Sequence, residues 1–136
     1  MEVALNSTIP TLAVAGLFTA FTVKHVLADY VLQTAAMVHG KEAKSHWLRP
    51  LSIHAAIHGA GTFLLVLAVG PTFWWLAPVD FVVHGAIDRT KSIIGGYGRW
   101  HPEEARFWWL HGADQALHHV THFAFVLLLG DAVALP

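Results

Sequence analysis

Histidine and aspartate recur at helical spacing inside the apolar stretches of this chain, most clearly in the segment DFVVHGAIDRTK, residues 80–91. Its Asp80, His84 and Asp88 are four residues apart, so a helix would place the three side chains on one face. Ionisable groups are costly in apolar helices and therefore mark functional sites by default. Three other apolar stretches carry the same pattern: His25 with Asp29, His54 with His58, and Asp114 with His118 and His122.

These residue types predict a site for a divalent metal. Neutral imidazole and carboxylate bind such ions, and residues at i and i+4 can hold one ion together. The chain has no cysteine, which excludes thiolate metal sites, iron–sulfur clusters and disulfides. Five histidines and three aspartates exceed the needs of one tetrahedral zinc, so we expect one or two ions, zinc before iron or manganese. The expected ligands are His25, Asp29, His54, His58, His84, Asp88, Asp114 and His118.

Other polar residues could assist chemistry at such an ion. A metal lowers the pKa of a bound water toward neutrality, and Asp88 or Asp114, if it does not itself bind the ion, could then act as the base. The residues expected beside the ligands are Gln33, Asp80, Gln115 and His122. Lys41, Arg89 and Lys91 could bind an anionic headgroup at the mouth of the site, although positive charge at a cytoplasmic surface is the simpler explanation for Arg89 and Lys91.

The elements that carry these residues are expected to be membrane helices. Hydrophobic residues make up 55% of the 136 and charged residues 12%, against about 45–50% and about 25% in soluble domains. A spanning helix needs about 20 residues, and four stretches fit: residues 9–33, 51–69, 73–94 and 110–129. We therefore predict an all-α fold, a single polytopic domain over residues 1–136 built as a four-transmembrane-helix bundle. The net charge of −1 gives no sign of a nucleic-acid partner.

The basic residues predict how these spans are oriented. Seven of the eight Lys and Arg residues lie in or beside the first and third connectors, so the positive-inside rule places both termini outside. The eight expected ligands then share one depth, in the cytoplasmic half of the bilayer. Asp80 and His122 would lie one to two turns deeper and could pair with each other. Lys24 is the exception among the basic residues, and we expect its side chain to reach the membrane surface.

The order of these motifs resembles the bacterial domain-of-unknown-function 3307 family. The similar elements are HVLADYVLQ (residues 25–33), Lys41, the histidine-bearing second span, HGAIDRTK (residues 84–91) and DQALH (residues 114–118). The resemblance covers nearly the whole chain and implies a small polytopic protein of the bacterial inner membrane, with no established activity. The matching positions are His25, Asp29, Gln33, Lys41, His54, His84, Asp88, Lys91, Asp114, Gln115 and His118. Against this family pattern, Asp80 and His122 look like additions in this chain.

Several functions fit this pattern. The leading hypothesis is a metal-dependent hydrolase acting on a membrane lipid or another amphiphile at the cytoplasmic side, because water and a scissile ester could both reach that depth. No GxSxG motif is present, which argues against a serine hydrolase. The same residues could instead form a divalent-metal or proton transporter or channel, a diiron oxygenase, or a b-type haem protein. The alternative without chemistry is a buried polar network that fixes helix register. A bundle this small could also self-associate.

Overall fold

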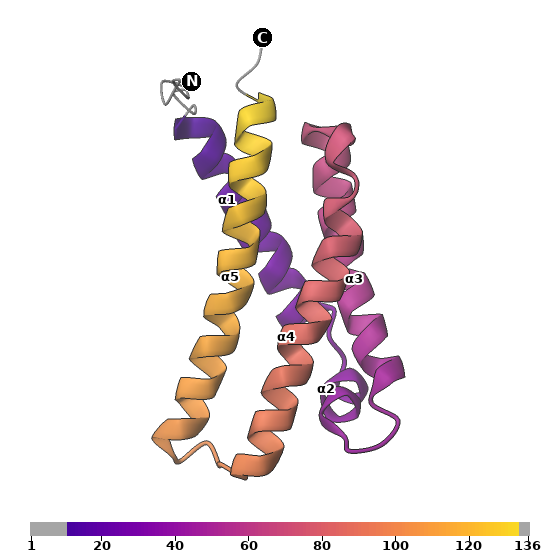
Figure 1. Cartoon of the computed structure of the whole chain (residues 1–136), viewed down its shortest axis with the longest axis vertical. Helices are drawn as coiled ribbons and strands as arrows, with labels where there is room; N and C mark the ends of the chain where they lie inside the picture. The colour runs from indigo at the N-terminus through magenta and orange to yellow at the C-terminus, as the bar shows by residue number, and fades with distance from the viewer. Residues whose placement is uncertain (1–10, 134–136) are drawn as a thin grey trace, which may run out of the picture.

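The computed structural model describes residues 11–133, and every regular element in that range is helical. Figure 1 shows long helices running along one axis with a short helix across one end. The order along the chain is α1 (Thr11–Val26), the π-helix η1 (Leu27–Val31), α2 (Ala35–Glu42), α3 (Leu48–Val69), the 3-10 turn η2 (Pro71–Phe73), α4 (Leu76–Gly98) and α5 (Ala105–Val133). The all-α prediction is therefore confirmed for the described residues.

Glycine and proline set several helix boundaries. Pro50 and Pro78 each lie in the first turn of a helix, α3 and α4, where a missing N–H leaves no intrahelical bond unmade. Gly70 ends α3, and Pro71 opens the 3-10 turn that leads into α4. After Gly98 the chain leaves α4 through Arg99, whose φ of 49° is left-handed. The break at Gly70 and Pro71 reverses the direction of the chain between α3 and α4, so the two helices pack side by side.

Helix α2 was not predicted, because the sequence from His39 onward was interpreted as a polar connector. Thr34 caps this helix, and its hydroxyl accepts a hydrogen bond from the N–H of Met37 at 3.3 Å. Gly40 allows α2 to lie against the start of α3, because a Cβ at this position would come within 2.6 Å of Pro50 Cγ. The consequence for the site is that Lys41 is carried under the bundle and buried there.

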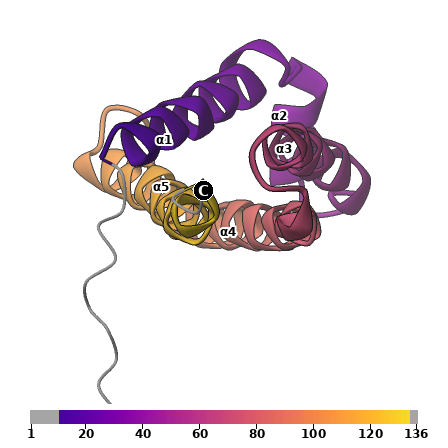
Figure 2. The same ribbon diagram turned by 90° about the horizontal axis from the view of Figure 1, so that it is seen from above.

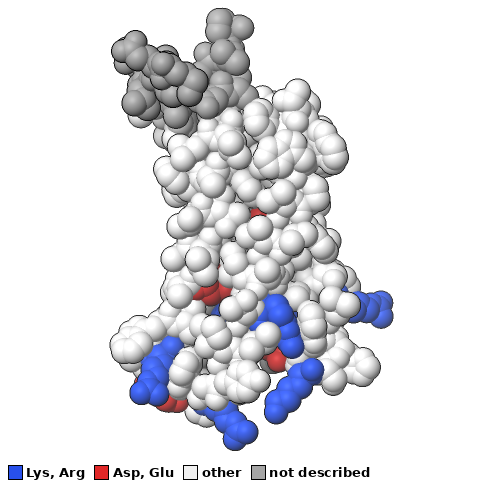
Figure 3. Space-filling view, in the orientation of Figure 1, with Lys and Arg blue, Asp and Glu red and all other residues white. Residues whose placement is uncertain are grey.

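The four long helices surround a core that is apolar toward one end and polar toward the other. Viewed from above, α5 lies beside α1, and α4 lies between α5 and α3 (Figure 2). The apolar core consists of Leu17, Phe21, Val66, Leu76, Phe125, Val126 and Leu129. Lysine and arginine side chains gather toward the opposite end, near the connectors, on the face seen in Figure 3. The buried histidines and aspartates therefore lie between an apolar end and a basic end.

Two helices in the described part of the chain have the length and apolar composition of a membrane span. They are Thr11–Val31, which is α1 continued by η1, and Leu48–Val69, which is α3. Long helices also occupy the two other stretches predicted to span, as α4 and α5. That these four helices span a membrane stays a prediction, which length and apolar composition support for α1 with η1 and for α3.

Candidate metal centre

The buried or half-buried histidines and aspartates of α1, η1, α3, α4 and α5 form what we call the polar layer. A π-helical turn brings Asp29 to the centre of this layer. The α-helical pattern of α1 stops at Val26, and Leu27–Val31 continues as a π-helix. A π turn widens the helix and is frequent at functional sites. Asp29 Oδ2 lies 3.3 Å from Nε2 of His25, one turn earlier, while Oδ1 faces the histidines of α3. The amide of Gln33 donates to the backbone carbonyl of Asp29 at 2.9 Å, which supports this turn.

Three imidazoles from two other helices converge on Asp29. Its Oδ1 lies 2.9 Å from His58 Nε2 and 3.2 Å from His54 Nε2. His84 Nε2 on α4 lies 3.1 Å from His54 Nε2, and all four ligand atoms fall within 4.8 Å of one another. Metal–ligand bonds of about 2.0–2.1 Å in a tetrahedron separate neighbouring ligand atoms by about 3.3 Å. The spacing of this group, the Asp29 cluster (Asp29, His54, His58 and His84), therefore fits one ion.

A second group of possible ligands shares His84 with the Asp29 cluster. It consists of His84, Asp88 and His118. His118 Nδ1 lies 2.9 Å from the carbonyl oxygen of Asp114, which favours the tautomer that leaves a lone pair on Nε2. That Nε2 is buried, has no hydrogen-bond partner among the described residues, and lies 3.9 Å from Asp88 Oδ1. A ring held by Nδ1 with a free Nε2 is the usual arrangement of a metal-binding histidine.

Each of the other three aspartates of the layer has a lysine partner. Lys24 Nζ lies 2.7 Å from Asp80, and Lys41 Nζ lies 2.6 Å from Asp88. Lys91 Nζ lies 3.4 Å from Asp114. Asp29 pairs only with imidazoles within residues 11–130. With neutral imidazoles the layer therefore keeps one uncompensated negative charge, and that charge lies at Asp29.

Lys24 does not reach the membrane surface as the sequence predicted. Its ammonium is buried, with Asp80 Oδ2 at 2.7 Å, Thr62 Oγ1 at 3.1 Å and His122 Nε2 at 3.1 Å. Gly61 makes room for the lysine stem, because a Cβ there would lie 2.8 Å from Lys24 Cγ. A buried ammonium needs paired and hydrogen-bonded partners, and these side chains supply them. The Asp80–His122 contact that we expected is also present, at 3.3 Å.

Sequence reasoning missed Thr62 and the burial of Lys24. Thr62 lies four residues after His58 on the inner face of α3, a spacing that could have indicated it. Its hydroxyl donates to Asp80 at 2.6 Å. No comparable signal existed for Lys24, which has no acidic residue at helical spacing on its own helix. Its partners come from α3, α4 and α5, so only the tertiary structure reveals them.

The remaining predicted residues lie around the edge of the layer. His25 Nε2 is 3.2 Å from the side-chain oxygen of Gln115, and the Gln115 amide donates to Asp114 at 3.2 Å. Arg89 stacks over Trp47, with 4.0 Å from its guanidinium carbon to the ring centre. Lys41, predicted to bind a headgroup, is buried against Asp88. Of the three predicted headgroup residues, Arg89 and Lys91 keep the more exposed side chains.

Several buried polar atoms in the layer have no hydrogen-bond partner among the residues described. Four of them are Nδ1 atoms of histidines that contact Asp29 or one another: His25, His54, His58 and His84. Unpaired buried polar atoms are costly and call for an explanation such as a water or an ion. Because the Nε2 atoms face inward, the free Nδ1 atoms lie on the outer side of the rings, where water would supply the missing hydrogen bonds.

Comparison with known proteins places the chain in one family and gives no further relative. The family model described as "Protein of unknown function (DUF3307)" matches residues 17–134. No curated protein and no solved structure matches the chain. The matched range contains every residue of the polar layer described above.

Proposed function

This chain belongs to the DUF3307 family, and from its own side-chain geometry we propose that it is a membrane-embedded, metal-dependent hydrolase of a lipid or another amphiphile. The observation that carries the metal is the charge pattern around Asp29. Three neighbouring aspartates are neutralised by lysines, whereas among the described side chains Asp29 pairs with imidazoles alone. Asp29 is largely buried, with 12% of its side chain exposed, and a carboxylate with so little solvent and no cationic partner is costly. A divalent ion between Asp29 and the three histidines would offset that cost.

Zinc fits the Asp29 cluster best. Three imidazole nitrogens and one carboxylate oxygen form the four-coordinate N/O set that zinc prefers, and iron or manganese would accept the same donors. His84 belongs to both candidate groups. An ion in the Asp29 cluster would use His84 as a ligand. Asp88 and His118 would then either complete this ion's surroundings or hold a second ion. A catalytic zinc keeps one position for water beside three protein ligands, so three of the four residues would hold it, and when bound it would supply a Lewis acid and an acidified water.

Asp88 is the better placed of the two carboxylates predicted to act as base. Its Oδ2 lies 3.4 Å from His54 Nε2 and 3.7 Å from His84 Nε2, so it borders the ligand atoms directly. Asp114 contacts His118 and Lys91 instead. We therefore assign to Asp88 the acceptance of a proton from water, with Lys41 holding its carboxylate in place. Asp114 would position His118.

The proposed setting is the bacterial inner membrane, with α1, α3, α4 and α5 as four spans. Large apolar side chains such as Leu64, Val82 and Val120 are exposed on the outer faces of the helices, where lipid would cover them. The basic connectors would face the cytoplasm and place both termini outside. The polar layer then lies toward the cytoplasmic headgroups, within reach of a lipid ester or phosphoester. This surface could also pair with a second copy of the chain.

The test of this function is hydrolysis of lipid esters and phosphoesters by the purified, untagged protein. We expect activity that chelation abolishes and zinc restores. Asp29→Asn should lose activity, whereas His101→Ala, in the exposed connector before α5, should keep it. Full activity after complete removal of metal would refute the mechanism.

Transport of a divalent metal or of protons is the second candidate, because Asp80 and His122 extend the polar line toward the apolar end. Lys24 opposes passage of a metal, since its ammonium sits within that extension and repels cations. Flux measurements in proteoliposomes distinguish the two functions. Metal binding without flux favours the hydrolase, and metal flux through the wild-type protein favours transport.

A further inference from the structure

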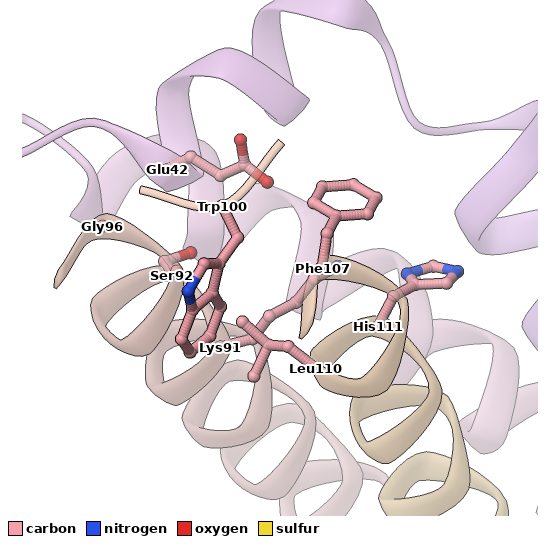
Figure 4. A pocket seen from close by; sticks show the side chains of 9 residues that line it. Glu42, Lys91, Ser92, Gly96, Trp100, Phe107, Leu110 and His111 are labelled. Carbon is pink, nitrogen blue, oxygen red and sulfur yellow. The ribbon is translucent and has the colours of Figure 1, made fainter. Parts of the chain in front are cut away.

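Two adjoining cavities beside the polar layer share Lys91. The first, of about 260 Å³, lies where α4, α5 and the connector between them meet (Figure 4). The second, of about 250 Å³, is a groove between α4 and α5. Lys91 and Leu110 line both cavities, so one elongated molecule could occupy the two together.

The first cavity carries charges of both signs and aromatic rings. Lys91 and Ser92 come from α4, Glu42 from α2, Trp100 from the connector and Phe107 from α5 (Figure 4). Glu42 is exposed and makes no ion pair among the described residues, so its carboxylate is available to a ligand. Lys91, whose ammonium is 3.4 Å from Asp114 and 27% exposed, suits a phosphate, whereas a carboxylate beside a tryptophan face suits an ammonium. This combination matches a headgroup that is both anionic and cationic.

The second cavity is apolar over most of its length. Ile87, Ile94, Ala113 and Leu117 line it, and Asp114 lies at its polar end beside Lys91. An acyl chain would fit such a groove, because the apolar lining would cover the hydrocarbon and bury no polar group without a partner. Asp114 in turn contacts His118 of the layer. A lipid in this groove would therefore place its headgroup linkage beside the candidate metal centre.

We propose that the α4–α5 groove and the adjoining cavity bind a zwitterionic phospholipid of the phosphoethanolamine type. The phosphate contacts Lys91, the ammonium contacts Glu42 and Trp100, and one acyl chain lies between α4 and α5. That this lipid is also the substrate rests on the proposed function. Binding itself depends on residues outside the Asp29 cluster.

Native mass spectrometry of the untagged protein, titrated with phosphatidylethanolamine or phosphatidylglycerol, tests the site. We expect the wild-type protein to bind phosphatidylethanolamine about threefold to fivefold more tightly, because an ion pair to the exposed Glu42 carboxylate contributes at most about 1 kcal/mol. Glu42→Gln should remove this preference, and Lys91→Ala should weaken both lipids, with recovery in Lys91→Arg. Free phosphoethanolamine should not displace the lipid, because it lacks the acyl chain.

The acyl-chain arm has a matched pair of variants on α5. Ala113→Phe would fill the groove and should weaken lipid binding, whereas Ala116→Phe, on an exposed position outside the groove, should not. Equal binding of the two lipids by the wild-type protein, or unchanged selectivity in Glu42→Gln, would overturn the proposal. Zinc content is measured on the same samples. Selective lipid binding by a protein that binds no zinc would refute the proposed hydrolase and support the lipid site. Zinc binding without lipid selectivity would refute the lipid site and leave the proposed hydrolase standing.

Discussion

Asp29 Oδ1 lies 2.9 Å from His58 Nε2, although the two residues belong to different helices and are 29 positions apart in the chain. The π turn at the end of α1 sets this contact, since it carries Asp29 toward α3. His54 and His84 then surround the same carboxylate. The relationship explains how an aspartate that has no lysine partner, and whose side chain is only 12% exposed, can stay inside the bundle if a cation binds it.

The first prediction concerns the buried lysine. Lys24→Met should lower the stability of the protein by about 3–5 kcal/mol, because it leaves Asp80 buried without its cation. The measurement is the shift of the thermal unfolding midpoint in detergent micelles. The double variant Lys24→Met with Asp80→Asn should recover much of the loss, since no uncompensated charge remains. A stable single variant would show that the pair contributes little.

The second prediction concerns the space beside that lysine. Gly61→Ala should destabilise the protein by about 1–3 kcal/mol, because the new Cβ would lie 2.8 Å from Lys24 Cγ. Gly16→Ala is the control, since a Cβ there meets no atom within 4 Å. Alanine favours a helix over glycine by about 1 kcal/mol, so Gly16→Ala should be neutral or stabilising. Equal effects of the two substitutions in unfolding experiments would contradict the close packing of the Lys24 side chain against Gly61.

The third prediction concerns the orientation in the membrane. The chain has no cysteine, so single cysteines can be introduced without interference. Thr72→Cys, between α3 and α4, should react with a membrane-impermeant maleimide on intact cells. Ser45→Cys, between α2 and α3, should react only after the membrane is opened, because the basic connectors face the cytoplasm. The reverse pattern would invert the topology, and labelling of both in intact cells would contradict four spans.

Helical spacing predicted much of the candidate site. Each of the pairs His25–Asp29, His54–His58 and His84–Asp88 lies within a single apolar stretch. A period of 3.6 residues places the two members of a pair on one helix face. Because all of these faces are the least lipid-like parts of their helices, they turn toward one another. The structure brings Asp29, His54, His58 and His84 together as that argument requires. The deeper position of Asp80 and His122 followed from the same counting.

The lysine partners could not be predicted in this way. Lys24 and Lys41 lie on segments whose own sequences offer no paired acid at the right spacing, and their partners lie 56 and 47 positions away. Helix α2 was missed because its second half, from His39 onward, was interpreted as a polar connector, and its position depends on packing against Pro50. The π turn at Asp29 likewise has no simple sequence signal. Each of these features depends on contacts between distant segments.

The central claim is that Asp29, His54, His58 and His84 bind a metal ion, and metal analysis of the untagged protein tests it most directly. We expect the wild-type protein, purified in detergent and equilibrated with zinc, to retain at least one tightly bound ion per chain. His58→Ala and Asp29→Asn should lose this ion, whereas His101→Ala should retain it. A wild-type protein that binds no zinc, iron or manganese, or a His58→Ala variant with full metal content, would contradict the account.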